Sequence, residues 1–359
     1  MADFPTNLEA ITPTFLSGVL EADVRAVRGT LVPAQGAVST AARLEVDYAS
    51  GSSGPEAVFA KWSAPLEAVR QMAAQNGMYR REVRFYTDLA ETSDIATPAC
   101  LFADWDRETD EFLLILEDMS ASRVGNFYAS SLADVEAVVD ALPRFHARWW
   151  NHPDLRRLRW LFPLDHPAAS AGLQAAFVGA LQRTQQRFPT EFGGALAATS
   201  RTIAEHYPEI AQRYAARPTT LVHSDLHLQQ VFFPGDAGGH FAIFDWQTIG
   251  RGFGGQDLSR IIAMSLTPEM RRANERALVE RYHAGLLEAG VSEYDREDCW
   301  NDYRLGISWN ALLNVIAGAS VDQTAMDADA SAYQTTLAET FFGRIDTALA
   351  DLDVAALLP

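Results

Sequence analysis

The chain has 359 residues, of which 48% are hydrophobic and 21% charged, and its formal net charge is −18. This length accommodates two lobes or domains with a sizeable core, and the composition is ordinary for a globular protein. The excess of acidic residues argues against a general nucleic-acid binder and against docking on an anionic membrane.

The cysteines and the N-terminal residues indicate the compartment in which the protein is expected to lie. Cys100 and Cys299 lie far apart, which argues against a disulfide framework or a zinc site and fits a reducing compartment. The N-terminal residues show no basic segment followed by an apolar core, so we predict no signal peptide. No apolar run approaches the roughly 18 residues that a membrane span needs. We therefore expect a cytoplasmic protein without a membrane partner.

The first third of the chain predicts a small β-rich domain. Residues 1–22 are expected to form an entry helix, with Thr14 as the cap of residues 15–20, and residues 66–90 a long helix. Alternating or continuous apolar residues predict strands between and after these helices. The strands are expected at 27–32, 39–48, 57–62, 100–105 and 112–117.

A break at residues 118–125 separates this region from a mainly helical remainder. Strands and a loop at 220–248 interrupt the helical pattern. The helices are expected at 132–150, 167–187, 196–214, 267–290, 296–317 and 331–354. This order predicts an α+β protein with two domains, residues 1–117 and residues 118–359.

Two aspartates each follow a short apolar strand in the middle of the chain. Asp225 lies in Leu221-Val-His-Ser-Asp-Leu-His-Leu-Gln-Gln230, and Asp245 lies in Phe244-Asp-Trp-Gln247. Hairpin-linked strands are expected to bring both carboxylates to the mouth of one cleft. Phosphoryl transfer from ATP needs one carboxylate to orient a hydroxyl and accept its proton, and another to hold Mg²⁺ on the phosphates. The pattern therefore predicts a phosphoryl-transfer site.

The segment 221–258 resembles the catalytic signature of the kinase fold. The form is that of the small-molecule branch, which contains aminoglycoside phosphotransferases, choline kinases and ecdysteroid-kinase-like proteins. His223, Ser224, Asp225 and His227 fall on its His-Gly-Asp-x-His-x-x-Asn pattern, and Gln230 stands where the pattern has Asn. Asp245-Trp246-Gln247, Gly250, Gly252 and Asp257-Leu258 resemble its Asp-Trp-Gln/Glu…Gly…Asp-Leu continuation.

The resemblance implies a bilobal protein-kinase-like fold, with a five-stranded antiparallel sheet plus a helix in the N-lobe and a large, mainly helical C-lobe. It implies that Asp225 is the catalytic base and Asp245 the Mg²⁺ ligand. Asp257 resembles the structural Asp that accepts backbone N–H bonds from the catalytic loop. A Ser-His-Asp hydrolase is excluded because adjacent residues cannot form the line of nucleophile, base and orienting acid.

A nucleotide site is expected in residues 1–117. Lys61, at the end of an apolar strand, would neutralise the α- and β-phosphates and pair with Glu82 on the following helix. The turn at residues 35–40 would cover the phosphates through backbone N–H groups and a hydroxyl. The expected contacts there are Gly36, Ser39 and Thr40, and the backbones of Glu117 and Met119 would meet the adenine edge.

Gln230 leaves alternatives open, because its amide oxygen sits roughly 1.5 Å further out than that of Asn and Mg²⁺ demands near-octahedral geometry. It is a metal ligand, acts through a water, or has no metal role, and the last case allows a catalytically impaired pseudokinase. His227, Trp309 and Asn310 are weaker candidates for the acceptor site.

We therefore predict an ATP- and Mg²⁺-dependent phosphotransferase that acts on a hydroxyl of a small molecule, with an apolar alcohol as the first acceptor class. An aminoglycoside or macrolide phosphotransferase and a nucleotide-binding pseudokinase are the alternatives. A protein kinase is disfavoured because there is no Ala-Pro-Glu motif and residues 245–257 are too few for a substantial activation loop. The oligomeric state stays open.

Overall fold

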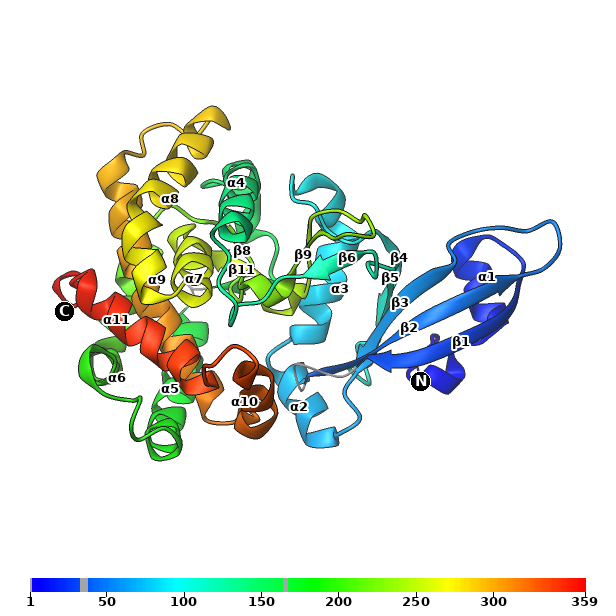
Figure 1. The fold of residues 1–359 in the computed structure, drawn as a ribbon, viewed down its shortest axis with the longest axis horizontal. Coiled ribbons are helices and arrows are strands. Elements are labelled where there is room, and N and C mark those ends of the chain that lie inside the picture. The colour runs from blue at the N-terminus through cyan, green and yellow to red at the C-terminus, as the bar shows by residue number, and fades with distance from the viewer. Residues whose placement is uncertain (1, 33–37, 164–166) are drawn as a thin grey trace. The chain divides into compact units, whose positions relative to one another are not determined.

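The computed structural model describes residues 2–32, 38–163 and 167–359. The chain folds into two compact units (Figure 1). The first unit comprises Met1–Arg123 and Phe232–Thr248, and the second comprises Val124–Val231 and Ile249–Pro359. The chain therefore returns to the first unit for a short segment that contains Asp245, whereas Asp225 belongs to the second unit.

The first unit is built on an antiparallel five-stranded sheet, which confirms the predicted N-terminal architecture. Its strand order is β1-β2-β3-β5-β4. The predicted strands agree with the observed ones to within three residues, because alternating or continuous apolar runs bounded by turn residues are strong strand signals. The strands are β1 (Val24–Val32), β2 (Ser39–Tyr48), β3 (Ala57–Ser63), β4 (Cys100–Trp105) and β5 (Phe112–Glu117).

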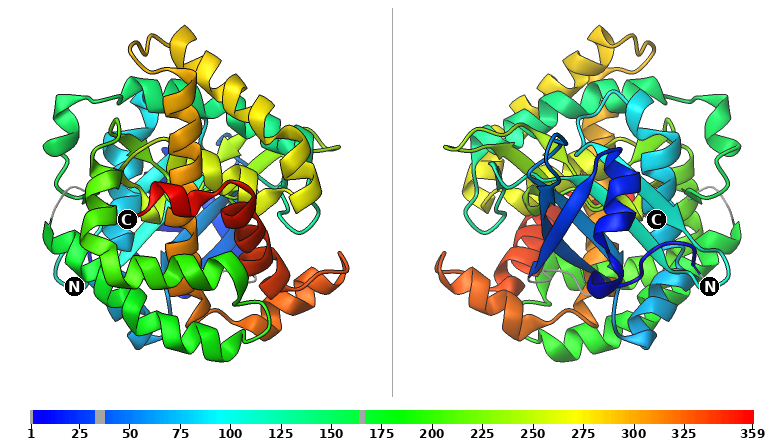
Figure 2. Two further views of the ribbon diagram at one scale, coloured as in Figure 1. Left: turned by 90° about the vertical axis from the view of Figure 1, so that its left-hand side faces the viewer. Right: turned by 90° about the vertical axis from the view of Figure 1, so that its right-hand side faces the viewer.

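Helices cover this sheet. Residues of α1 (Pro13–Leu20) belong to one apolar cluster with the β3 residues Val58, Ala60 and Trp62, and Figure 2 (right) shows α1 against the strands. The entry helix predicted over residues 1–22 is shorter than expected, because α1 begins only at Pro13. The predicted cap was also wrong: Thr12 accepts the Phe15 N–H at 3.2 Å. Pro13 follows as the first helical residue, a position that suits its fixed φ and missing N–H.

The single helix predicted over residues 66–90 is in fact two. They are α2 (Glu67–Gln75) and α3 (Met78–Asp88), separated at Gly77, which has φ 63°. A left-handed backbone conformation suits glycine and ends a right-handed helix. The break leaves α3 as a separate amphipathic helix, with Glu82 and Phe85 buried on it.

Two small sheets accompany the central part of the chain. One has the order β10-β9-β6, formed by β6 (Ser122–Val124), β9 (Val231–Pro234) and β10 (Ala242–Ile243). The other belongs to the second unit and has the order β7-β11-β8, with β7 (Phe162–Pro163), β8 (Thr220–Val222) and β11 (Gly250–Gly252). The loop that carries Asp225 begins directly after β8.

The second unit is mainly helical, as predicted. Figure 2 (left) shows α9 running through the middle of its helices, and α9 contacts α5, α6, α7, α8 and α11. Every residue of α7 is buried. The helices are α4 (Leu132–Arg148), α5 (Pro167–Arg187), α6 (Gly194–Ala215), α7 (Gly255–Ser265), α8 (Pro268–Glu288) and α9 (Arg296–Gly318), followed by α10 (Gln323–Ser331) and α11 (Arg344–Asp351).

The helix predicted over residues 331–354 was wrong in its first half. α10 ends at Ser331, Gln334 has φ 56°, and a new helical segment starts at Leu337 and continues into the π-helical turn Glu339–Gly343. Thr336 and Glu339 explain the restart: the Thr336 hydroxyl accepts the Glu339 N–H at 3.1 Å, and the Glu339 carboxylate accepts the Thr336 N–H at 3.0 Å. This reciprocal pair is a capping box, which marks a helix beginning.

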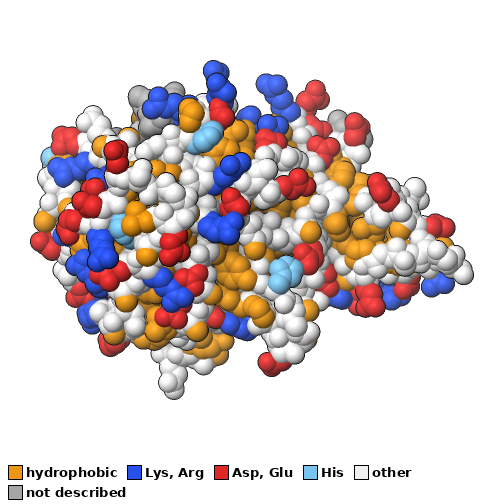
Figure 3. Space-filling model, turned by 90° about the horizontal axis from the view of Figure 1, so that it is seen from above, with side chains coloured by type: hydrophobic (Ala, Val, Ile, Leu, Met, Phe, Trp, Pro, Cys, Tyr) orange, Lys and Arg blue, Asp and Glu red, His pale blue; other side chains and the backbone are white. Residues whose placement is uncertain are grey.

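Basic and acidic side chains are interspersed on the face drawn in Figure 3, where blue and red groups lie among each other. None of the helices in the described part of the chain is long and apolar enough to span a membrane.

Candidate functional site

Lys61 lies on β3, the central strand of the first unit's sheet, opposite Ala41 of β2 and Leu114 of β5. Side chains alternate across a strand, so Lys61 points to the face opposite Ala60 and Trp62. Its ammonium nitrogen lies 2.7 Å from Glu82 Oε1 and 2.7 Å from Asp245 Oδ1. The ion pair expected between Lys61 and Glu82 is present, and Asp245 joins it.

Lys61 is the only lysine in the chain, which otherwise uses arginine for its permanently charged basic side chains. An ammonium is a compact point charge, whereas a guanidinium is a planar fork, so the two are not interchangeable at a tight site. The one lysine of this chain sits between two carboxylates, with its side chain 12% exposed. This placement points to a requirement for a small cation at position 61.

Lys61 is one cation between two carboxyl groups, those of Glu82 and Asp245. Burial lowers the pKa of Lys61, but Asp245 and Glu82 outweigh that effect and raise it, so Lys61 stays charged. Burial raises the pKa of Glu82, and Lys61 only partly offsets the rise. One cation compensates two carboxylates. The desolvation of the Glu82 carboxylate, whose side chain is 2% exposed, is therefore only partly compensated. A further cation would therefore be stabilised here.

α3 holds the segment that carries Asp245. The Phe85 and Trp246 rings stack with centroids 3.9 Å apart and an interplanar angle of 13°. Arg81 donates from Nε to the Gln247 carbonyl at 2.9 Å. Asp245 itself has φ 65°, a left-handed conformation that Asp tolerates better than most residues. Sequence reasoning missed Arg81, which directly precedes the predicted Glu82.

The oxygen atoms around Asp245 are of the kind that Mg²⁺ binds. Asp245 Oδ2 accepts the Gln247 side-chain N–H at 3.2 Å. Gln247 Oε1 and Glu82 Oε2 are buried without a hydrogen-bond partner among the described residues. No group of three or more His, Cys, Asp or Glu side chains within the described ranges could hold a metal. Mg²⁺ does not need one, because it binds one or two carboxylates and completes its shell with waters and phosphate oxygens.

Of the other residues expected to bind nucleotide, Ser39, Thr40 and Glu117 lie at strand ends of the first unit. Ser39 and Thr40 begin β2, and Gly36 lies outside the described residues. Glu117 ends β5, and its N–H donates to the Ala99 carbonyl at 2.8 Å. Met119 is buried, and its carbonyl accepts the Ser122 N–H at 2.9 Å. Their contacts with a nucleotide stay predictions.

In the second unit, Asp257 organises the loop that carries Asp225. Its carboxylate accepts the backbone N–H groups of His223 at 2.7 Å and Ser224 at 2.9 Å. The predicted hydrogen bonds from the loop to Asp257 are therefore present. His146 Nε2 lies 3.4 Å from the same carboxylate, and all of these groups except Ser224 are almost fully buried.

Ser224 stands where the kinase pattern has glycine, and its backbone conformation is one that suits glycine. Its φ is 70°, in the left-handed region that glycine adopts without strain. A non-glycine residue there costs about 1–3 kcal/mol and persists only where its surroundings enforce it. The two hydrogen bonds that the His223 and Ser224 N–H groups donate to Asp257 supply that enforcement.

Asp225 is paired with an arginine that the sequence analysis did not identify. Arg260 Nε and Nη2 lie 2.9 Å and 2.5 Å from Asp225 Oδ1. The Asp225 side chain is 32% exposed and the Arg260 side chain 5%. Burial raises the pKa of Asp225, but Arg260, with His227 and His223, outweighs it and lowers the pKa. Asp225 is therefore a carboxylate with one oxygen engaged.

His227 and Gln230 lie on the same loop as Asp225. His227 Nε2 is 3.9 Å from Asp225 Oδ1, and its ring meets Phe127 edge-on with centroids 5.4 Å apart. Gln230 ends the 3₁₀ turn Leu228–Gln230, where its N–H donates to the His227 carbonyl at 2.8 Å. Their metal and acceptor roles stay predictions.

Trp309 and Asn310 lie on α9 and are buried. The Trp309 ring packs edge-on against Tyr214 with centroids 5.7 Å apart. The Asn310 amide contacts Arg260, with Oδ1 3.4 Å from Nη1, and donates to the Gly306 carbonyl at 3.0 Å. Asn310 is thus linked to Asp225 through Arg260.

A family model and several solved structures match this chain. The model, described as DUF1679, uncharacterised oxidoreductase dhs-27, matches residues 176–353. The gentamicin complex of APH(2″)-IIa has a TM-score of 0.52 and 14% identity, over 94% of this chain and 100% of that chain. Ethanolamine kinase from Plasmodium vivax has a TM-score of 0.51 and 9% identity, over 91% of this chain and 81% of that chain. No curated protein matches the sequence.

A third solved structure, a ternary complex of the aminoglycoside phosphotransferase APH(4)-Ia with ADP and hygromycin B, has a TM-score of 0.50 and 13% identity, over 96% of this chain and 98% of that chain. At such low identities these likenesses show the fold. The chain has the fold of small-molecule kinases and phosphotransferases, which confirms at that level the resemblance found in residues 221–258.

Proposed function

We propose that the protein is a kinase that transfers the γ-phosphoryl group of ATP to a hydroxyl of a small molecule with the help of Mg²⁺. The observation that carries the proposal is the placement of the chain's only lysine, partly buried between Glu82 and Asp245. Such a group of one cation and two carboxylates suits the binding of a metal–phosphate complex. The fold supports the same assignment.

On the nucleotide side, Lys61 neutralises phosphate charge and Glu82 positions it. Asp245 supplies the carboxylate that holds Mg²⁺, which when bound neutralises charge on the phosphate oxygens. Phosphoryl transfer requires little covalent chemistry from the protein, so placement of these charges is the main contribution. The stack of Phe85 on Trp246 keeps the Asp245 segment attached to the helix that carries Glu82.

On the acceptor side, Asp225 accepts a hydrogen bond from the substrate hydroxyl. As the oxygen–phosphorus bond forms, the hydroxyl proton passes to Asp225, and ADP leaves with the electron pair of the broken phosphorus–oxygen bond. The lowered pKa of Asp225 makes it a weak base. Its contribution is therefore orientation of the hydroxyl followed by late acceptance of the proton.

We favour a neutral alcohol as the acceptor. Arg260 compensates the charge of Asp225 and two histidines flank it, so this carboxylate offers little attraction to a polycation such as an aminoglycoside. An antibiotic phosphotransferase remains the second candidate, supported by the fold shared with APH(2″)-IIa and APH(4)-Ia. Resistance conferred on a susceptible host would separate the two.

The oxidoreductase in the matched family's description gains no support from the glycine-rich segment. Gly250, Gly252 and Gly255 have the spacing of a dinucleotide-binding loop. Gly250 and Gly252 are the two ends of β11, and Gly255 is the first residue of α7. A Cβ at Gly252 would clash with the Gln256 side chain, and one at Gly255 with the Asp302 carbonyl. These glycines are therefore needed for packing against the protein itself.

Replacing Gln230 by Asn is expected to retain or raise the transfer rate, because it places the amide oxygen where the kinase pattern has it. Steady-state kinetics of wild type and Q230N at several Mg²⁺ concentrations would measure this, with Gln230→Leu as the variant that removes the amide. A large loss of turnover in Q230N would show that the longer side chain is itself required.

The proposed function is tested by incubating the protein with Mg²⁺-ATP and a panel of alcohols, and by searching the products for a phosphate-sized mass gain. The panel should contain aromatic and sterol-like alcohols, amino alcohols and aminoglycosides. A phosphorylated product that is absent with Asp225→Asn supports the kinase. Nucleotide binding without any turnover, even to ADP and phosphate, would instead indicate a pseudokinase.

A further inference from the structure

We propose that Arg260 is the positioning residue of the acceptor site: it holds Oδ1 of Asp225 through two N–H bonds and thereby directs Oδ2 to the substrate hydroxyl. The inference rests on the proposed function, in which Asp225 orients the acceptor. It adds a residue from α7 to the candidates for the acceptor site.

The geometry of the pair is asymmetric. Both Arg260 Nε, at 2.9 Å, and Nη2, at 2.5 Å, point at the same carboxylate oxygen. An arginine that used its fork on both oxygens would cover the whole carboxylate. Because both Arg260 N–H groups donate to Oδ1, the orientation of the Asp225 carboxylate is fixed and Oδ2 lies outside the Arg260 contact.

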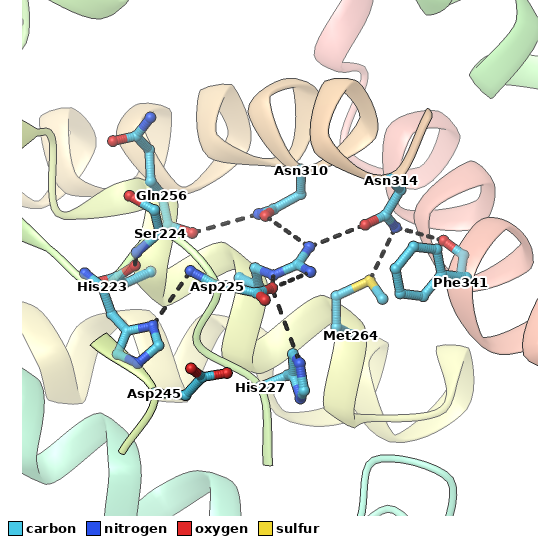
Figure 4. Close-up of polar contacts among 12 residues, drawn as sticks. His223, Ser224, Asp225, His227, Asp245, Gln256, Met264, Asn310, Asn314 and Phe341 are labelled. Atoms are coloured by element: carbon cyan, nitrogen blue, oxygen red, sulfur yellow. Dashed lines mark hydrogen bonds and ion pairs between the residues drawn. The ribbon is translucent and has the colours of Figure 1, made fainter. Parts of the chain in front are cut away.

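The guanidinium is held from its other side by two amides. Asn310 and Asn314 project from one helix, α9 (Figure 4), and their Oδ1 atoms lie 3.4 Å and 3.0 Å from Arg260 Nη1. Asn314 in turn donates to the Phe341 carbonyl at 2.6 Å, within the π-helical turn Glu339–Gly343. Arg260 is 4% exposed, and Asn310 and Asn314 are fully buried. The orientation of the fork is therefore set by the core of the second unit.

α7 uses adjacent turns to hold the loop. Asp257 binds the backbone of His223 and Ser224, and Arg260, three residues later, binds the carboxylate of Asp225. Residues three apart lie on the same face of a helix. One helix face thus fixes both the path of the loop and the direction of its reactive side chain.

This arrangement makes distinct chemical predictions. The charged groups that act on Asp225 within its unit are Arg260, His227 and His223, and Arg260 has the largest of these three effects. Arg260→Gln removes the cation, so the pKa of Asp225 should rise. Arg260→Lys keeps a cation but loses the fork, so the pKa should stay low while the direction of Oδ2 is lost. A residue needed only for stability would not separate these two variants.

The direct experiment is a ¹³C NMR titration of aspartate carboxyl signals without nucleotide, with the Asp225 signal assigned by its absence in Asp225→Asn. We expect the wild-type pKa of Asp225 to lie below the ordinary aspartate value, to rise in R260Q, and to remain low in R260K. The control is Arg271→Gln: Arg271 is 1% exposed and pairs with Glu275, 2.6 Å away. Its loss should leave the Asp225 titration unchanged.

An ordinary or raised pKa of Asp225 in the wild type would overturn the proposal without any variant, and so would an unchanged titration in R260Q. Once a substrate that accepts the phosphoryl group has been identified, R260K should lower kcat about 100-fold with the KM for ATP unchanged. An unaltered kcat in R260K would refute positioning. Absence of Mg²⁺-ATP binding would refute the kinase instead, since the titration reads the ion pair without nucleotide.

Discussion

Replacing Asp225 by Asn is expected to lower the rate of phosphoryl transfer about 10³-fold, the scale of a positioned general base, with the affinity for Mg²⁺-ATP unchanged. Asn keeps an oxygen that can accept the Arg260 bonds but cannot take the hydroxyl proton at neutral pH. Single-turnover kinetics with a phosphorylated acceptor as readout, together with calorimetry for nucleotide affinity, would separate chemistry from binding.

The control for Asp225→Asn is Asp351→Asn. Asp351 is also an arginine-paired carboxylate of the second unit: its side chain is 30% exposed, and its Oδ2 lies 2.7 Å from Arg272 Nε. Both variants remove one charge from an Asp–Arg pair, so both should lose some stability. Only the Asp225 variant should lose transfer. Equal activity losses in the two variants would assign the effect to folding and not to chemistry.

Replacing Lys61 by Met is expected to reduce transfer by about 10²–10³-fold and to make stability strongly dependent on pH. The variant leaves Glu82 and Asp245 without their shared cation, and breaking a buried pair in this way costs about 3 kcal/mol. Burial already raises the pKa of Glu82 with Lys61 present, so removing the cation should raise it further.

The sign of the pH effect follows from that rise. An acid whose pKa is higher in the folded state is stabilising when protonated, and the stability is lost as the pH increases through the folded-state pKa. Lys61→Met should therefore be close to wild-type stability at low pH and fall progressively behind it towards pH 8. Thermal unfolding across this range measures the effect, and adding Glu82→Gln should restore stability at pH 8. A loss that does not change with pH would contradict the buried pair.

Much of the first unit could be predicted because its strands have strong local signals. The run Phe112–Glu117 is almost entirely apolar and buried, and residues of Ser39–Tyr48 alternate between buried and partly exposed. The failures arose where a backbone conformation decides the structure. Gly77 ends α2 through its positive φ, and the Thr336–Glu339 capping box restarts the last helices. Both signals were present in the sequence but were outweighed by helical periodicity.

The residues predicted for the site were those that carry a sequence motif, and the ones missed act through contacts distant in sequence. Lys61 and Glu82 form the expected ion pair, and Asp257 binds the loop. Arg260 lies 35 residues from Asp225 in the sequence, and the motif that contains Asp225 does not predict their contact. Its position three residues after Asp257 was the available signal, because it places Arg260 on the helix face that holds the loop.

The most direct test of the central claim is a calorimetric titration of ATP, with and without Mg²⁺, into the wild type, Asp245→Asn and the control Asp47→Asn, whose side chain is 36% exposed in the wild type. The account predicts magnesium-dependent binding in the wild type and in D47N that collapses in D245N, because Asp245 holds the metal beside Lys61. The single lysine adds a second readout, since one ¹³Cε-lysine NMR signal should shift when the nucleotide binds. Equal binding in all three proteins, or binding in none, would contradict a kinase site at Lys61, Glu82 and Asp245.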